Sequence, residues 1–276
     1  MSKQLMVCLI LVAVLGDRFM QTEGGIEFMT KVVTKTKGAL TKANMKCAEG
    51  RTDLHDAAEK GNLDEVKKII QKGAKIDSTD KDKRKPLHLA AMNGRKNVVE
   101  FLIMKRANIN SLDKANQTPL HLATENGHDV IARILIRSGA QFDAIDSLKR
   151  TPLHYAAKKG LKDIVEELIT KGANLNNKDL HGSIPLSLAI SNGKADVAEK
   201  LINKGSDLTS KDEYGDTPLH LAVRNGILKI VQLLVEKGAS LTARDNRPNR
   251  RTPYETACAF SGENLQEIAA YLRTKL

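Results

Sequence analysis

A spacing of 33 residues recurs through most of the chain and limits the folds that the sequence can adopt. Leucine, glycine and aspartate each return at this spacing. The positions concerned are Leu54, Leu87, Leu120, Leu153, Leu186 and Leu219; Gly61, Gly94, Gly127, Gly160, Gly193 and Gly226; and Asp80, Asp113, Asp146, Asp179, Asp212 and Asp245. Three residue types that share one period indicate one structural unit repeated in tandem, in which each unit contacts its neighbours.

Each unit opens on a recognisable helix start. The motif Thr-Pro-Leu-His-Leu-Ala begins at Thr118 and Thr217, and close variants begin at Lys85 and Thr151. The threonine hydroxyl caps the first turn, and proline suits the first helical position, where its missing N–H is not needed. A glycine such as Gly127 should end this short helix with a positive φ angle.

A second helix should follow in each unit, because apolar residues recur there in pairs. One such stripe consists of Val98, Val99, Leu102 and Ile103, and similar stripes occur at 164–169 and 230–235. This spacing is that of an amphipathic helix with a period of 3.6 residues. Because one helix pair cannot bury its stripe alone, we expect the pairs to stack on one another.

The motif and its period resemble those of the ankyrin repeat family over residues 50–276. The resemblance implies an all-α solenoid of seven stacked helix-turn-helix units with β-hairpin-like turns, in which the first and last units act as caps. Glu65 and Arg273 fit such caps, because they stand where inner units have apolar residues. The resemblance also implies that the concave surface of turn tips and first helices binds other proteins.

Two units depart from the pattern in ways that should cost stability. Arg106 stands where other units have a helix-ending glycine, and a bulky residue at positive φ costs about 1 kcal/mol. Ile184 replaces the capping threonine of the fifth unit, at a cost of about 1 kcal/mol, and Ser187 replaces its histidine. We therefore expect the fifth unit to be the weakest internal one.

The recurring histidines and aspartates invite a catalytic or metal-binding interpretation. Packed helices lie roughly 8–10 Å apart, which is too far for histidines of neighbouring units to share a metal ion. The resemblance implies that each ring instead bonds main-chain groups near the turn, and aspartates start turns by bonding their own backbone. Since the chain also has no phosphate loop, nucleophile elbow or zinc-protease helix motif, we expect no enzyme, no metal and no cofactor. The histidines of the repeat are His55, His88, His121, His154 and His220.

The first 49 residues lie outside the period and contain a different signal. Lys3 precedes eleven uncharged apolar residues, from Leu5 to Leu15, and Gly16 follows them. This pattern is typical of a secretory signal peptide, and the run is too short to span a bilayer, although a buried core helix is the alternative. We expect a signal peptide at 1–16, an arm or removed propeptide at 17–49, and no membrane span in the mature chain.

The cysteines Cys8, Cys47 and Cys258 are too few for a disulfide-stapled fold or a four-cysteine zinc site. Cys8 would leave with the signal peptide. Cys258 takes the place of Ala157 in the repeat motif, so we expect it to be small and buried.

Charge and composition narrow the class of partner. The formal net charge of +11 favours an acidic partner, whereas 3% aromatic residues and no tryptophan argue against stacking on single-stranded nucleic acid. We expect a protein partner with an acidic surface and no nucleic acid. The expected binding residues are Lys149, Lys158, Lys159, Tyr214 and Arg224, and the candidate glycosylation site is Asn116, in the triplet Asn-Gln-Thr.

These features lead to two hypotheses for function. The first is a secreted, non-enzymatic protein-binding module, an effector of venom, saliva or a parasite that acts on a protein of another organism. The second is a cytoplasmic protein that sequesters a signalling or transcription factor, like the ankyrin inhibitors of the Rel type. The basic charge and the apolar leader favour the first hypothesis.

Overall fold

The computed structural model describes residues 50–260 and 262–276. The chain divides into two compact units, Met1–Arg51 and Thr52–Leu276, of which the second is described below. The expected signal peptide, the expected arm, Cys8 and Cys47 lie outside the described residues.

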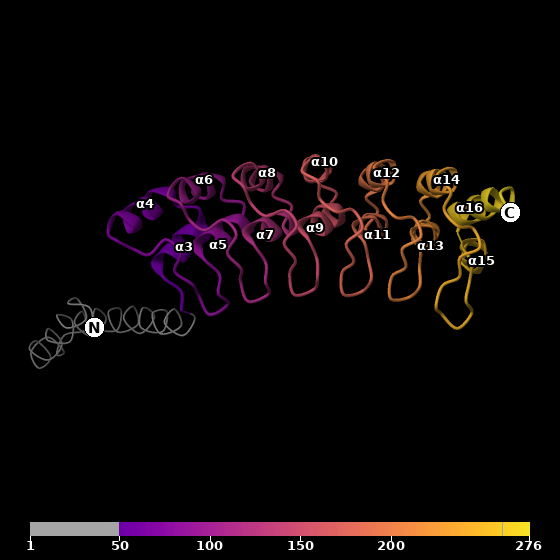
Figure 1. Ribbon diagram of the computed structural model, residues 1–276, viewed down its shortest axis with the longest axis horizontal. Coiled ribbons are helices and arrows are strands. Elements are labelled where there is room, and N and C mark those ends of the chain that lie inside the picture. The colour runs from indigo at the N-terminus through magenta and orange to yellow at the C-terminus, as the bar shows by residue number, and fades with distance from the viewer. Residues whose placement is uncertain (1–49, 261) are drawn as a thin grey trace, which may run out of the picture. The chain divides into compact units, whose positions relative to one another are not determined.

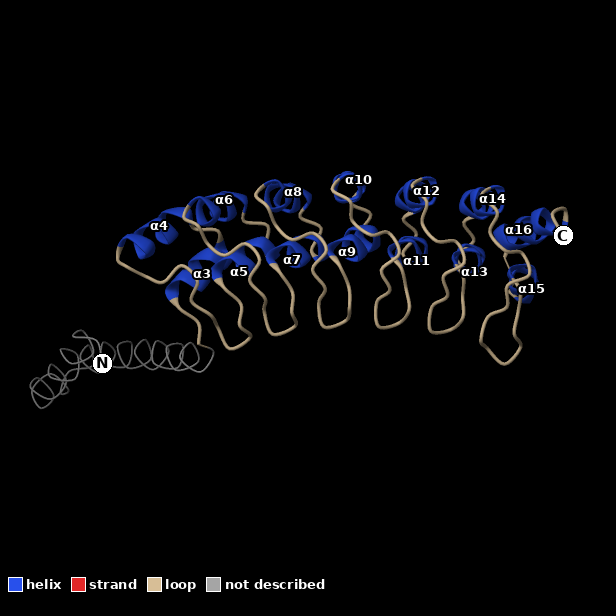
Figure 2. Ribbon diagram, viewed as in Figure 1, coloured by secondary structure: helices blue, strands red, loops and turns tan. Residues whose placement is uncertain are grey.

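Within the described residues every regular element is a helix, and the helices form seven pairs, here called repeats one to seven (Figures 1 and 2). Inner helices pack on inner helices of neighbouring repeats, and outer helices pack on outer helices. The inner helices are α3 (Asp53–Lys60), α5 (Pro86–Met92), α7 (Pro119–Glu125), α9 (Pro152–Lys159), α11 (Pro185–Ser191), α13 (Pro218–Arg224) and α15 (Pro253–Ala259). The outer helices are α4 (Leu63–Gln71), α6 (Lys96–Met104), α8 (Asp129–Arg137), α10 (Lys162–Thr170), α12 (Ala195–Asn203), α14 (Leu228–Glu236) and α16 (Glu263–Arg273). This is the all-α solenoid that the 33-residue period predicts.

The core runs along the stack between the two helix layers. The periodic leucines of the inner helices, from Leu54 to Leu219, are all at most 1% exposed. On the outer helices Val98, Val99 and Leu102 are fully buried, which confirms the apolar stripe. Since burial of one such side chain stabilises a fold by about 1.5–3 kcal/mol, packing within and between repeats stabilises the stack.

The expected helix ends and departures are confirmed locally. Gly94, Gly127 and Gly160 have φ angles between 72° and 81°. Arg106 has a φ of 63°, so it adopts the left-handed conformation that other repeats give to glycine. Ile184 provides no side-chain cap to α11, as its apolar side chain requires.

Each turn tip, the loop from a recurring aspartate to the next inner helix, is closed by that aspartate. In repeat three, Asp113 Oδ1 accepts the backbone N–H groups of Ala115 and Gln117, each at 2.8 Å. Asp80, Asp146, Asp179 and Asp212 bond their own turns in the same way. The aspartates therefore shape the turns, as predicted.

Successive tips are joined by one backbone hydrogen bond each. The N–H of Ser147 donates to the carbonyl oxygen of Ala115 at 2.8 Å, and the N–H of Leu180 donates to that of Leu148 at 2.9 Å. The same bond joins Lys114 to Asp82, Glu213 to His181 and Asn246 to Tyr214. The tips therefore form a continuous edge, which in Figure 1 runs below the inner helices.

The prediction for Cys258 is wrong, because its side chain is exposed. The equivalent Ala157 in repeat four is fully buried under the next inner helix. Among the described residues no further inner helix packs on α15, so the motif position alone did not determine burial.

Candidate functional site

The repeat histidines act as structural links between a helix start and the next turn. Nδ1 of His154 accepts the backbone N–H of Thr151 at 3.1 Å, and its Nε2 lies 3.2 Å from the carbonyl oxygen of Ser183. These partners fix the ring as neutral, with its proton on Nε2 donating to the carbonyl. The same pairing is present at His55, His88, His121 and His220.

Burial keeps four of these rings uncharged. It lowers the pKa of His88 to about 4 and also lowers the pKa values of His121, His154 and His220. Both ring nitrogens are already used, so none of these histidines can serve as a base without breaking the link. Over 50–260 and 262–276, no three His, Cys, Asp or Glu side chains are grouped as a metal site would require.

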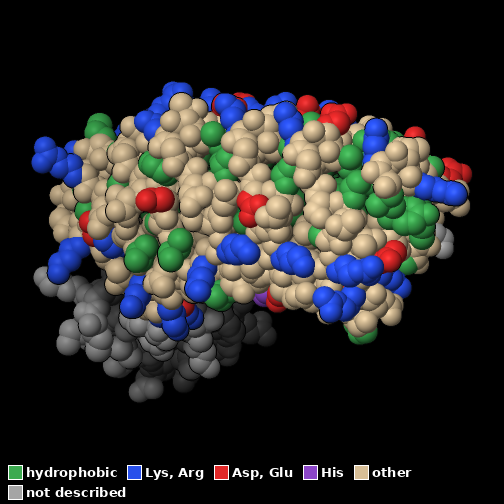
Figure 3. Space-filling model, turned by 45° about the vertical axis from the view of Figure 1, so that its right-hand side comes forward, with side chains coloured by type: hydrophobic (Ala, Val, Ile, Leu, Met, Phe, Trp, Pro, Cys, Tyr) green, Lys and Arg blue, Asp and Glu red, His purple; other side chains and the backbone are tan. Residues whose placement is uncertain are grey.

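The three lysines of the predicted binding patch lie together on repeat four. Lys149 is exposed at the turn tip with a φ of 58°, and Lys158 and Lys159 form the last turn of α9. None of the three forms an ion pair with any described residue. Figure 3 shows Lys and Arg side chains following one another along the lower half of one face of the stack.

Tyr214 and Arg224 lie on repeat six, and both side chains contact other side chains of the stack, which the sequence did not predict. Arg224 pairs with Asp216 at 3.3 Å and with Asp245 at 3.1 Å, and its side chain is 19% exposed. Arg247 pairs with the same two carboxylates and covers the ring of Tyr214 at 5.0 Å. Tyr214 remains 54% exposed, whereas the charge of Arg224 is neutralised within the stack.

The structure does not bring all five predicted residues together. Repeat five lies between the lysines of repeat four and Tyr214 of repeat six. At 8–10 Å for each packed helix, the two groups are separated by about 16–20 Å. A partner must therefore span three repeats to contact both.

The binding residues expected from the sequence did not include the exposed apolar side chains at the turn tips. Leu148 and Leu180 are exposed on adjacent tips, and Leu112 and Ile145 are exposed directly before the aspartates of repeats three and four. Other repeats have Thr79, Lys178, Lys211 and Arg244 at the position of the last two. A comparison of the positions directly before the aspartates would therefore have revealed Leu112 and Ile145 as unusual.

Asn116 is exposed at the tip of repeat three with a φ of 58°. The third residue of its triplet, Thr118, is buried and caps α7. The asparagine is thus accessible in the folded tip, whereas the threonine is part of the frame.

No helix among the described residues combines the length and apolar character needed to cross a bilayer.

Comparisons with known proteins address most of the repeat region. The family model for ankyrin repeats (3 copies) matches residues 24–113, 106–179 and 175–245. The crystal structure of the human ASB11 ankyrin repeat domain is similar, with a TM-score of 0.70 and 25% identity over 80% of this chain and 98% of that one. No match was found among curated proteins. The matched residues cover most of the chain, and the chain belongs to the ankyrin repeat family.

Proposed function

We propose that this chain is a secreted protein whose repeats four to six bind an acidic surface of a partner protein. Ankyrin repeats indicate a protein-binding module, and their fold is generally a non-enzymatic interaction scaffold. The effector role on a protein of another organism stays a prediction of the sequence.

The observation that carries the proposal is the contrast between free and paired charges. Lys149, Lys158 and Lys159 form no ion pair with described residues, and Lys149 directly follows the exposed tip residue Leu148. Free ammonium groups beside apolar side chains suit a partner that presents carboxylates around an apolar contact.

Several charges of the outer helices, by contrast, pair across repeats. Lys200 of α12 and Lys204, the C-cap residue of that helix, both pair with Glu166 of α10. Lys229 of α14 pairs with Glu199 of α12 at 2.6 Å. These pairs neutralise part of the charge of the outer layer and so weaken the field that could steer a partner there.

Binding is tested with a partner identified by affinity capture and then purified. Changing both Lys158→Glu and Lys159→Glu should slow association and reduce its dependence on salt, because steering acts on the association rate. Tyr214→Ala should weaken binding by more than about 1 kcal/mol, chiefly through faster dissociation. Association and dissociation rates are measured by surface plasmon resonance at two salt concentrations.

The matched control is the pair Lys171→Glu and Lys237→Glu. These two lysines are also exposed at helix ends, but they follow the outer helices α10 and α14. The control should leave both rates unchanged. Equal effects of the two double variants, or none of either, would place the binding surface elsewhere.

Secretion is tested by sequencing the N-terminus of the protein recovered from producing cells. Cleavage after Gly16 or a few residues later is expected in the medium. A fraction glycosylated at Asn116 would shift in mass on glycosidase treatment. Wholly cytosolic protein that retains Met1 would instead favour the intracellular alternative.

A further inference from the structure

The side chain of the N-cap residue of an outer helix can extend to the preceding repeat. Arg95, His128 and Lys194 are the N-cap residues of α6, α8 and α12. A Cβ atom added to Gly61 would lie 2.7 Å from Cδ of Arg95, and one added to Gly160 would lie 2.9 Å from Cδ of Lys194. His128 covers the glycine of its preceding repeat in the same way. These side chains therefore fill a groove between consecutive repeats.

Two of these side chains also bond the end of the preceding inner helix. Nε of Arg95 donates to the carbonyl oxygen of Glu59 at 2.8 Å, and Nε2 of His128 lies 3.0 Å from that of Met92. Carbonyl oxygens at a helix end have no intrahelical partner and carry partial negative charge. Arg95, His128 and Lys194 fill this groove in their own repeats. Leu161 and Ile227 stand at the same position before α10 and α14, and no atom lies within 4 Å of a Cβ added at Gly127 or Gly193.

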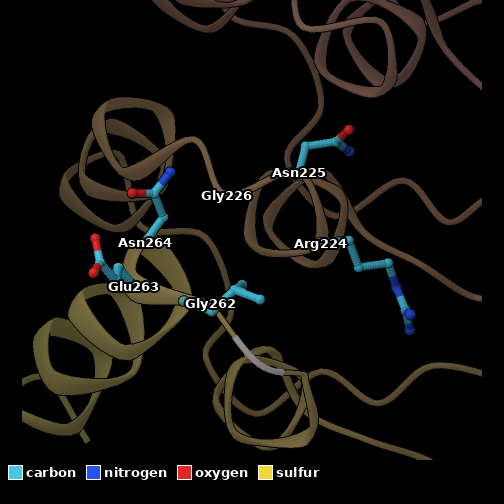
Figure 4. Close-up of a pocket in the computed structure, with 7 residues that line it drawn as sticks. Arg224, Asn225, Gly226, Gly262, Glu263 and Asn264 are labelled. Atoms are coloured by element: carbon cyan, nitrogen blue, oxygen red, sulfur yellow. The ribbon is translucent and has the colours of Figure 1, made fainter.

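Gly262 takes this position in repeat seven and leaves the groove open. It is the N-cap residue of α16. It stands ten residues after Thr252, just as Lys194 stands ten residues after Ile184, so the two positions are equivalent. A pocket of about 400 Å³ lies between Gly226 of repeat six and the start of α16 (Figure 4). The nearest atom to a Cβ added at Gly226 is Cβ of Asn264, at 3.5 Å, so no long side chain occupies the pocket.

One acidic and one basic residue line the pocket. Glu263 lines it and forms no ion pair with any described residue. In Figure 4 the guanidinium of Arg224 points away from Glu263 and Asn264, consistent with its pairing to Asp216 and Asp245. The main-chain carbonyl of Arg224 occupies the position of the carbonyls that Arg95 and His128 bond in earlier repeats.

We propose that the pocket at Gly262 binds an arginine side chain of a partner protein. The guanidinium donates to the carbonyl oxygen of Arg224 and pairs with Glu263, as Arg95 bonds Glu59 between repeats one and two. The proposal rests on the protein-binding function above, and it adds a contact in which this chain supplies the carboxylate and the partner supplies the cation.

The test uses the intact 15N-labelled protein and N-acetyl-arginine methylamide as the probe. Saturable chemical-shift changes are expected at the amides of Asn225, Gly226, Glu263 and Asn264. The dissociation constant should be millimolar, because one side chain buries little surface. The citrulline analogue has the same shape without the charge and should bind at least several-fold more weakly.

Two variants separate the pocket from general attraction. Gly262→Arg fills the groove from within and should abolish the shifts, whereas the conservative Glu263→Gln should weaken binding several-fold. The proposal would be overturned if the citrulline analogue bound as tightly as the arginine probe. It would also be overturned if the arginine probe caused no saturable shifts, or caused the same shifts in Gly262→Arg as in the unchanged protein. The variant Lys158→Glu with Lys159→Glu should retain the arginine response, so loss of partner binding in that variant bears on the proposed function alone.

Discussion

The buried imidazoles are the residues whose charge the fold controls most closely. Each one links the start of an inner helix to the following turn through both of its ring nitrogens. A second proton on such a ring would remove the acceptor at Nδ1 and place a charge in the core. The links are therefore strong only while the rings are neutral.

The protein should lose stability as pH falls below about 6.5. Burial lowers the pKa of His88 to about 4, so the unfolded chain takes up this proton first as the pH decreases. The free energy of unfolding should fall by about 1.4 kcal/mol per pH unit from this residue alone, until the pH reaches about 4. Urea unfolding at several pH values measures the fall. An NMR titration in which the folded His88 ring protonates near pH 6.5 would contradict the explanation.

Arg106→Gly should stabilise the protein by up to about 1 kcal/mol. The φ of 63° is unfavourable for arginine and costs glycine nothing. The neighbouring Lys105 has a φ of −83°, so Lys105→Gly is the matched control and should be neutral or destabilising. Both changes are compared by urea unfolding at pH 7, and equal effects would show that φ is not the cause.

Local residue patterns predicted local geometry well. The φ of Arg106 and the missing cap at Ile184 depend on a few neighbouring residues, and both were confirmed. The pairing of Arg224 depends on Asp245 in the next repeat, and the exposure of Cys258 depends on what covers α15. Such contacts cannot be read from one repeat considered alone.

At the scale of the helix pair, repeat five lacks the link that its neighbours have. Ile184 and Ser187 are both buried at the positions where repeats one, three, four and six have threonine and histidine. The fifth inner helix therefore has neither the hydroxyl cap nor the imidazole link to the next turn. Its weakness relative to other internal repeats stays a prediction.

Restoring the motif in repeat five should be cooperative. Ile184→Thr together with Ser187→His should stabilise the protein more than the sum of the single changes, by about 0.5–1 kcal/mol, because the two side chains bond each other. The reverse pair in repeat four, Thr151→Ile with His154→Ser, should destabilise it. Unfolding free energies of all variants give the coupling energy. Strict additivity would show that the two positions act independently.

At the scale of the whole repeat region, stability should decrease toward the last repeat. Inner helix α9 packs on α7 and α11, whereas α15 packs on α13 and on its own partner α16. In a stack with nearest-neighbour contacts, a unit with one neighbour opens more easily. Hydrogen exchange of the intact protein should therefore be faster in α15 and α16 than in α9 and α10. Uniform protection across the four helices would show that the stack unfolds only as one body.

The arrangement of the repeats could be predicted because the period specifies it. The candidate binding surface could be predicted only in part. The period placed Lys149, Lys158 and Lys159 on one repeat, and the structure does so as well. It could not show that Arg247 covers Tyr214, since the two lie on different tips. The pocket at Gly262 depends equally on a side chain that repeat seven lacks.

The hydrogen bonds between turn tips have a consequence for how such a chain can change length. Each runs from the residue after an aspartate to the residue two after the preceding aspartate, for example from Ser147 to Ala115. Duplication or deletion of one 33-residue block leaves every new junction with a matching donor and acceptor. Recombination can therefore add or remove whole repeats without disturbing the edge. An insertion of another length within that span would instead shift the N–H donor out of register with its carbonyl acceptor.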